Sequence, residues 1–178
     1  MKQKHALLCG NWLTVLATYF TLALMASAQT PLVLSGTSYS YTQNFDAIGG
    51  GLPPEWAVYT NATATDPGTM TSFNTNALNW DSPTAEFGNF ASATANDSTG
   101  FSGNESPDLQ AAATNRAPGI RPDDAGAALV LQITNTLGFA NFKLTADFLD
   151  LGTNGDTNTW TVDYAVGDVP TNFIPVTT

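Results

Sequence analysis

The stretch FANFKLTADFL, residues 139–149, decides the expected fold. From Phe142 to Phe148 apolar residues alternate with polar ones, and this period of two predicts a β-strand with one face in water. A second stretch with the same period, TWTVDYAV, follows at residues 159–166. Gly, Thr, Asn and Asp fill residues 152–158, a composition typical of turns. We therefore expect the two strands to form an antiparallel hairpin.

Other stretches extend the strand pattern. AALVLQIT, residues 127–134, is nearly continuous apolar sequence and predicts a central strand buried on both faces. WAVYT at 56–60 predicts a short strand, and weaker strand patterns occupy residues 38–45 and 69–73. Residues 92–126 are polar and contain Gly, Pro and Ser throughout, so we expect a long surface excursion there.

Short strands between turn signals, with almost no helical periodicity, predict an all-β fold, an antiparallel β-sandwich or jelly roll. The chain stops at NFIPVTT, residues 172–178, which has the composition of the start of another strand. A sandwich needs that strand and a partner to close its sheet. We therefore expect a module truncated at its C-terminus, with further domains of a longer chain beyond it.

The chain opens with the pattern of a secretory signal peptide, residues 1–28. Two lysines precede an apolar stretch, residues 12–26, and an Ala-Ser-Ala cleavage site ends at Ala28. Cleavage before Gln29 leaves residues 29–178, enough for a single domain. We expect a secreted or cell-surface protein with no membrane segment after this cleavage.

Without the leader the chain has three basic residues against fifteen acids, a net charge of −12, and it has neither His nor Cys. This composition excludes a disulfide framework, a thiol nucleophile, a Ser-His-Asp triad and a His- or Cys-ligated zinc site. Three cations cannot neutralise a row of phosphates, so nucleic acid is a poor partner. The same charge opposes binding to anionic membranes.

A pair of carboxylates is the only catalytic equipment that remains, and glycosidases work with such a pair. Asp147 and Asp163 fall on the outward faces of the predicted strands, where an acid is usually just solvated. The other acids near them stand in turns, where Asp binds the local backbone: Asp150, Asp156 and Asp168. We therefore expect no enzymatic activity.

A calcium site is the one cofactor hypothesis. Four residues of the predicted hairpin turn offer oxygen ligands that could hold a structural Ca²⁺: Asp150, Asn154, Asp156 and Asn158. Their spacing lacks the Gly and the final bidentate acid of an EF-hand, so an ordinary turn is the alternative.

Two of the three cations, Arg116 and Arg121, precede the acids Asp123 and Asp124. We expect structural ion pairs among these four residues that fix a loop onto the sandwich. A grip on a carboxylate or on sugar hydroxyls is the functional alternative.

Aromatic residues could form a stacking platform for sugar rings. Trp56 follows a Pro-Pro turn and Trp160 begins a predicted strand, so we expect both to plug the ends of the core. Trp80 stands in the polar segment NWDS and is the best candidate for an exposed, ligand-binding aromatic residue.

Three stretches, taken together, resemble N-terminal modules of secreted bacterial surface proteins. NFDAIGGGLPPEW, residues 44–56, is similar to the opening of jelly-roll modules of the cleaved-adhesin type. NRAPGIR at 115–121, with the Gly-Ala-Ala that follows, and TWTVDYAVG at 159–167, with Thr-Asn-Phe after it, are similar to segments of Bacteroidetes-type modules. The resemblance implies a jelly-roll-like sandwich ahead of other extracellular domains, with no catalytic residues to transfer. Pro118 and the missing closing strands depart from the pattern.

The sequence thus favours a non-catalytic secreted or cell-surface module for adhesion, glycan contact or domain spacing, whose partner is a glycan or an extracellular surface. One alternative is an accessory or catalytic part of a secreted polysaccharide hydrolase. Another is a structural extracellular coat or matrix protein, although a net charge of −12 opposes its self-association.

Overall fold

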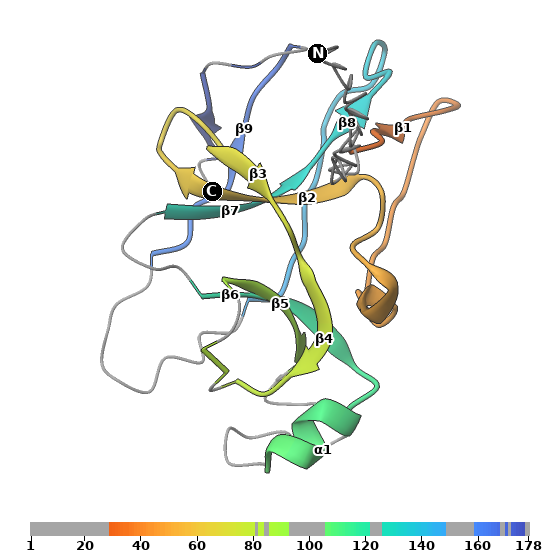
Figure 1. Ribbon diagram of the computed structural model, residues 1–178. Coiled ribbons are helices and arrows are strands. Elements are labelled where there is room, and N and C mark those ends of the chain that lie inside the picture. Colours follow the sequence, from red (N-terminus) through yellow and green to blue (C-terminus); the bar gives the residue numbers. More distant parts are fainter. Residues whose placement is uncertain are drawn as a thin grey trace, which may run out of the picture.

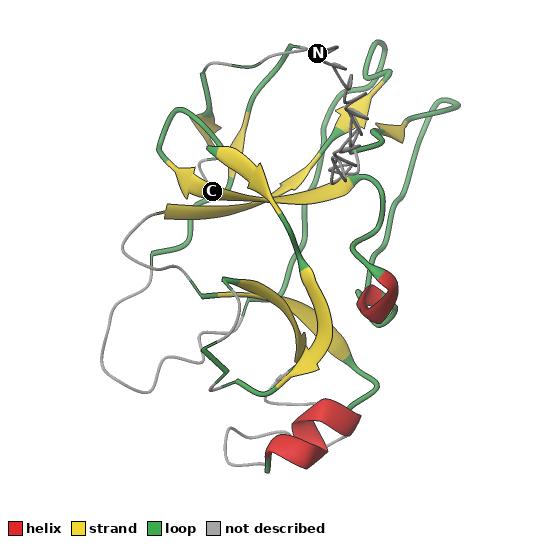
Figure 2. Cartoon of the chain, in the orientation of Figure 1, coloured by secondary structure: helices red, strands yellow, loops and turns green. Residues whose placement is uncertain are grey.

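A computed structural model describes residues 29–80, 82–83, 86–92, 106–121, 126–148, 159–167, 170 and 172–176. Strands dominate this part of the chain, together with one 3-10 turn and one short α-helix (Figures 1 and 2). The elements are β1 (Leu32–Val33), η1 (Ile48–Gly50), β2 (Trp56–Ala62), β3 (Thr69–Thr71), β4 (Asn74–Leu78), β5 (Phe87–Ala91), α1 (Pro107–Ala112), β6 (Arg116–Ile120), β7 (Gly126–Leu131), β8 (Ile133–Thr134), β9 (Asp163–Tyr164) and β10 (Ile174–Pro175).

Two three-stranded sheets form the body of the molecule. The upper sheet in Figure 1 has the order β3-β2-β7 and is antiparallel, with Trp56 opposite Leu131. A bulge at Asn61, whose φ is 60°, shifts the register near the end of β2. The lower sheet has the order β4-β5-β6, in which β4 runs parallel and β6 antiparallel to β5. The chain passes directly from β3 to β4, so one short link joins the two sheets (Figure 1).

Two smaller sheets flank the upper one. β1 pairs with β8 in parallel, and β9 pairs with β10 in an antiparallel arrangement. α1 lies below the lower sheet, where it contacts β4 and β5 (Figure 1). None of the four sheets is closed by the strands that the structure describes.

The most buried strand is β5, whose sequence FGNFA is buried at all five positions. Phe87 is only 1% exposed, and Ile48 and Val58 are buried almost as completely. The Phe90 ring lies over Gly119, because a Cβ built on that glycine would stand 2.2 Å from the ring atom Cδ2. Glycine on the neighbouring strand thus makes the room that an aromatic side chain of β5 fills.

The predicted hairpin is wrong in the described part of the chain. Residues 139–148 form no strand, and residues 140–148 are exposed throughout. Of residues 159–166 only Asp163 and Tyr164 form a strand, and their partner is β10. A period of two shows which face of a strand would be apolar, but a strand forms only where a neighbour completes its hydrogen bonds. The predicted turn lies outside the described residues.

The other strand predictions are confirmed in part. Residues 56–60 belong to β2, and residues 69–71 form β3. The segment 127–134 is extended as predicted, but it is split into β7 and β8, and β7 is a half-buried edge strand rather than a central one. No strand forms at residues 38–45.

The predicted surface excursion, residues 92–126, is confirmed only in part where it is described, because α1 is mostly exposed but the stretch is not free of regular structure. It contains α1 and β6, and two of its polar residues, Gln110 and Arg116, are buried. The helix begins after Ser106, whose side chain accepts a hydrogen bond from the Leu109 N–H. Among the described residues no helix has the length and apolar character needed to cross a bilayer.

Candidate functional site

Exposed apolar side chains gather on the two-stranded β9–β10 sheet. Tyr164 lies opposite Ile174, and the Val176 N–H donates to the Val162 carbonyl at 2.8 Å. The register therefore places these four side chains on one face of the pair. Trp160 continues the alternation, and its ring contacts that of Phe148, with the ring centroids 5.2 Å apart. We call these six residues the C-terminal apolar face: Phe148, Trp160, Val162, Tyr164, Ile174 and Val176.

The C-terminal apolar face is open to solvent. The exposed fractions of its six side chains range from 37% to 56%, and Phe142 and Leu144 in the preceding segment exceed 60%. Soluble monomers rarely leave large apolar patches uncovered, and such patches mark sites of interaction. The face is therefore the strongest candidate for a binding surface in the described part of the chain.

The backbone beside this face pairs with none of the strands that the structure describes. No backbone hydrogen bond joins residues 140–148 to any strand among the described residues. This segment nevertheless has the alternation of a strand with one apolar side. It thus offers apolar side chains, together with N–H and C=O groups that no described strand pairs, to whatever covers it.

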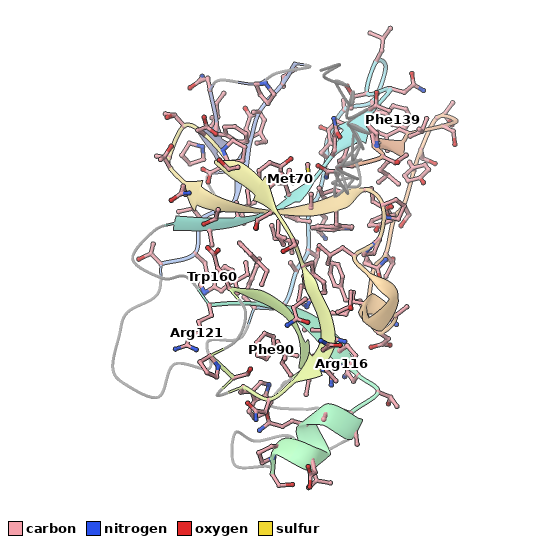
Figure 3. All side chains as sticks on the ribbon, viewed as in Figure 1. Met70, Phe90, Arg116, Arg121, Phe139 and Trp160 are labelled. Carbon is pink, nitrogen blue, oxygen red and sulfur yellow. The ribbon has the colours of Figure 1, made fainter. Side chains whose placement is uncertain are left out.

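Trp160 lies where sequence reasoning does not place it. The prediction that it plugs the core is wrong, because it is 48% exposed (Figure 3). Trp80, predicted to be exposed, is half-buried. Its indole Nε1 donates to the Ala91 carbonyl at 2.9 Å, and its backbone N–H donates to Gln110 Oε1 at 2.6 Å. Trp56 is half-buried, as a residue at the edge of a core should be.

The sequence does contain a pattern that bears on the exposure of Trp160. It shares one face with Val162 and Tyr164, so all three are buried or exposed together. Their exposure depends on whether a second layer covers that face, and the local pattern carries no information about the layer.

Arg116 is a buried cation whose side chain joins parts of the lower half of the molecule. Its side chain is buried between β5 and α1 (Figure 3). Nε donates to Asn89 Oδ1 and one Nη to the Asn89 carbonyl, both at 2.7 Å. The other Nη donates to the carbonyls of Gln110 and Ala113 at 2.7 and 3.4 Å. All four of these bonds go to neutral oxygens. The acids predicted to pair with Arg116, Asp123 and Asp124, lie outside the described residues.

This arrangement of Arg116 ties three elements together. The Arg116 guanidinium joins β5 to the end of α1, and its backbone N–H donates to Asp46 Oδ1 at 3.1 Å, next to η1. Burial lowers the pKa of the Arg116 guanidinium below its ordinary value. The side chain is only 5% exposed and its donors reach β5 and α1, so the geometry favours structural support.

Arg121 differs from Arg116 in being exposed. Its Nη1 donates to the Ser82 carbonyl at 3.2 Å, and its backbone N–H to the Glu86 carbonyl at 2.7 Å. Asp123 and Asp124, its predicted partners, lie outside the described residues.

A polar cluster at the start of β2 is not predicted by the sequence pattern. The Tyr41 hydroxyl donates to the Glu55 carboxylate and accepts a hydrogen bond from Trp56 Nε1 at 2.8 Å. Phe45 packs edge-on against the Trp56 ring, with the centroids 5.2 Å apart. Burial raises the pKa of Tyr41, and the hydrogen bond to Glu55 raises it further. Only the tertiary fold brings residue 41 close to residue 55, so no local sequence motif predicts the cluster.

Most of the remaining predicted site residues lie in parts of the chain that the structure does not describe. The calcium ligands Asp150, Asn154, Asp156 and Asn158 lie outside the described residues, as does Ala28 of the cleavage site. In the part of the chain that is described, no group of three or more acidic side chains could hold a metal ion. Of the acids considered for catalysis, Asp163 is exposed and accepts a hydrogen bond from the Thr161 hydroxyl at 2.9 Å.

The chain was compared with protein-family models, with curated proteins and with solved structures, and none of the three comparisons found a match.

Proposed function

We propose that the chain is a non-catalytic, secreted or cell-surface module that works by binding another polypeptide. In this proposal, a β-strand of a neighbouring polypeptide domain covers the C-terminal apolar face. The observation that carries this proposal is the exposure of six large apolar side chains, four of which share one face of the β9–β10 pair. A surface of this kind serves adhesion or the fixed spacing of domains.

The chemistry of the segment favours a polypeptide as the occupant. Residues 140–148 have exposed side chains and no described strand beside their backbone, so an occupant can supply both side-chain cover and backbone hydrogen bonds. A strand supplies both, because its own N–H and C=O groups complete the ladder while its side chains meet the apolar face. A second copy of the chain is disfavoured, because two molecules with a net charge of −12 each repel one another.

The finer fold belongs to the same proposal. Once paired, residues 140–148 and 159–166 would become full strands, and the open sheets would approach the antiparallel sandwich or jelly roll that the sequence predicts. The resemblance to N-terminal modules of the cleaved-adhesin type supports this view, because those modules precede other extracellular domains.

Glycan contact is the second candidate, and one observation favours it. Phe148 and Trp160 form an exposed ring pair with an interplanar angle of 37°. Adjacent exposed rings offer an apolar platform to a sugar ring.

Site-specific photo-cross-linking in the secreted protein distinguishes these candidates. A benzophenone side chain placed at Phe142 stands in the exposed segment beside the apolar face, and one placed at Tyr39 is the control, because Tyr39 is exposed far from that segment in the chain. The proposal expects a cross-link from Phe142 to another polypeptide stretch and none from Tyr39. Cross-linking to carbohydrate, or equal yields at the two positions, would overturn it.

A further inference from the structure

The side chain of Gln29 is held by two strands of the upper sheet. Its Nε2 donates to the Glu55 carbonyl at 2.6 Å, just before β2, and to the Val130 carbonyl of β7 at 3.0 Å. Its Oε1 accepts a hydrogen bond from the Tyr59 hydroxyl at 3.4 Å. Both amide hydrogens and the amide oxygen are therefore in use, at the residue that the predicted cleavage makes the first of the mature chain.

The segment after Gln29 continues this attachment. The Thr30 N–H donates to the Pro54 carbonyl at 2.7 Å, and β1 then pairs with β8. Leu34, at the end of this strap, is buried. Residues 29–34 are thus attached to the fold along their whole length, beginning at Gln29.

An N-terminal glutamine has a reaction of its own. Its α-amino nitrogen attacks the side-chain Cδ, a five-membered lactam forms, and the Cδ–Nε2 bond breaks. Nε2 leaves as ammonia, and no oxidant or reductant is needed. Applied to Gln29, this reaction would remove the donor that binds the carbonyls of Glu55 and Val130.

We propose that Gln29 is the N-terminal residue of the mature protein and that folding keeps it in its open, uncyclised form, because β2 and β7 hold its carboxamide. This inference is independent of the C-terminal apolar face. Cyclisation in the folded state must break two hydrogen bonds, and it leaves the Val130 carbonyl without the partner that Gln29 supplies. The fold thereby protects a terminus that is chemically labile in the unfolded chain.

The test uses the secreted protein and mass spectrometry of its N-terminal peptide. Samples are incubated at the same pH and temperature in native buffer and in concentrated urea, and the loss of one ammonia from Gln29 is followed with time. We expect an N-terminus at Gln29 with an intact carboxamide, and cyclisation roughly tenfold or more slower in the native sample. Another N-terminus, a fully cyclised native protein, or equal rates in the two samples would overturn the proposal.

A second measurement tests the role of the carboxamide directly. Protein cyclised in urea is returned to native buffer, and its urea unfolding is compared with that of uncyclised protein treated in the same way. We expect the cyclised protein to unfold at a lower urea concentration, because two hydrogen bonds to β2 and β7 are lost. Coincident unfolding curves would show that the carboxamide does not hold the terminus, and would contradict the inference.

Discussion

At the scale of single residues, Arg116 shows how this chain uses one of its few cations. A guanidinium has five donors in a planar fork, and here they reach three backbone carbonyls and one amide oxygen on two elements. A lysine offers one point charge on a flexible stem and cannot reproduce that fork. The residue therefore matters for its shape as much as for its charge.

Replacing Arg116 with lysine tests this role. We expect Arg116→Lys to lower the free energy of unfolding by about 2 kcal/mol or more, because buried carbonyls of β5 and α1 lose their donors. Arg121→Lys is the matched control, since Arg121 is exposed, and should change it by no more than about 0.5 kcal/mol. Urea unfolding of both variants checks the pair, and equal losses would contradict the structural role of Arg116.

Two tyrosines predict how stability depends on pH. Burial raises the pKa of Tyr41 and of Tyr59 above the ordinary value of 10.0. As pH rises through that value the unfolded chain releases protons that the folded chain keeps, so the free energy of unfolding falls. We expect this fall to be shallower in the double variant Tyr41→Phe, Tyr59→Phe, measured by urea unfolding at a series of alkaline pH values. An unchanged slope would show that these two phenols are not its source.

At the scale of elements, β5 and β6 depend on glycine at their contact. A Cβ at Gly119 would stand 2.2 Å from the Phe90 ring, whereas a Cβ at Gly50 would meet nothing within 4 Å. We expect Gly119→Ala to destabilise the protein by about 1–3 kcal/mol, because the ring must move within a packed sheet. Gly50→Ala, the control, should have a much smaller effect. Thermal unfolding measures both, and a neutral Gly119→Ala would contradict the packing described for Phe90.

The elements also show what the sequence can predict. WAVYT is recognisable as a strand because β-branched and aromatic residues suit a half-buried sheet. FGNFA, the most buried strand, escapes prediction because glycine and asparagine weaken its local strand signal, while its stability comes from β4 and β6 on either side. The strongest local pattern, residues 142–148, forms no strand because no described neighbour pairs with it.

The candidate site, like the strands, is predictable only as far as local sequence patterns determine it. Alternation along the chain is enough to place Trp160, Val162 and Tyr164 on one face. Whether that face is buried is decided by other parts of the fold, and no local pattern contains them. The contacts of Arg116 and Trp80 with Asn89 and Ala91 are not predictable from local sequence, because both partners belong to β5, the strand that escapes prediction.

At the scale of the whole molecule, two kinds of surface stand in contrast. The two three-stranded sheets bury their own apolar residues around Val58, Phe87 and Ile48. The C-terminal segments instead present theirs to solvent, on a chain whose formal net charge of −10 opposes the association of like molecules. This combination suits a module that stays soluble by repulsion and joins a different polypeptide through one apolar face.

Hydrogen exchange in the protein purified from its native source tests this claim most directly. The readout is the amide exchange of residues 140–148, with buried β5 as the slow reference and the exposed residues 36–40 as the fast one. If a neighbouring strand pairs with this segment, its amides should exchange nearly as slowly as those of β5. Exchange as fast as that of residues 36–40 would mean that no strand of a neighbouring polypeptide pairs with residues 140–148, and would contradict the proposed function.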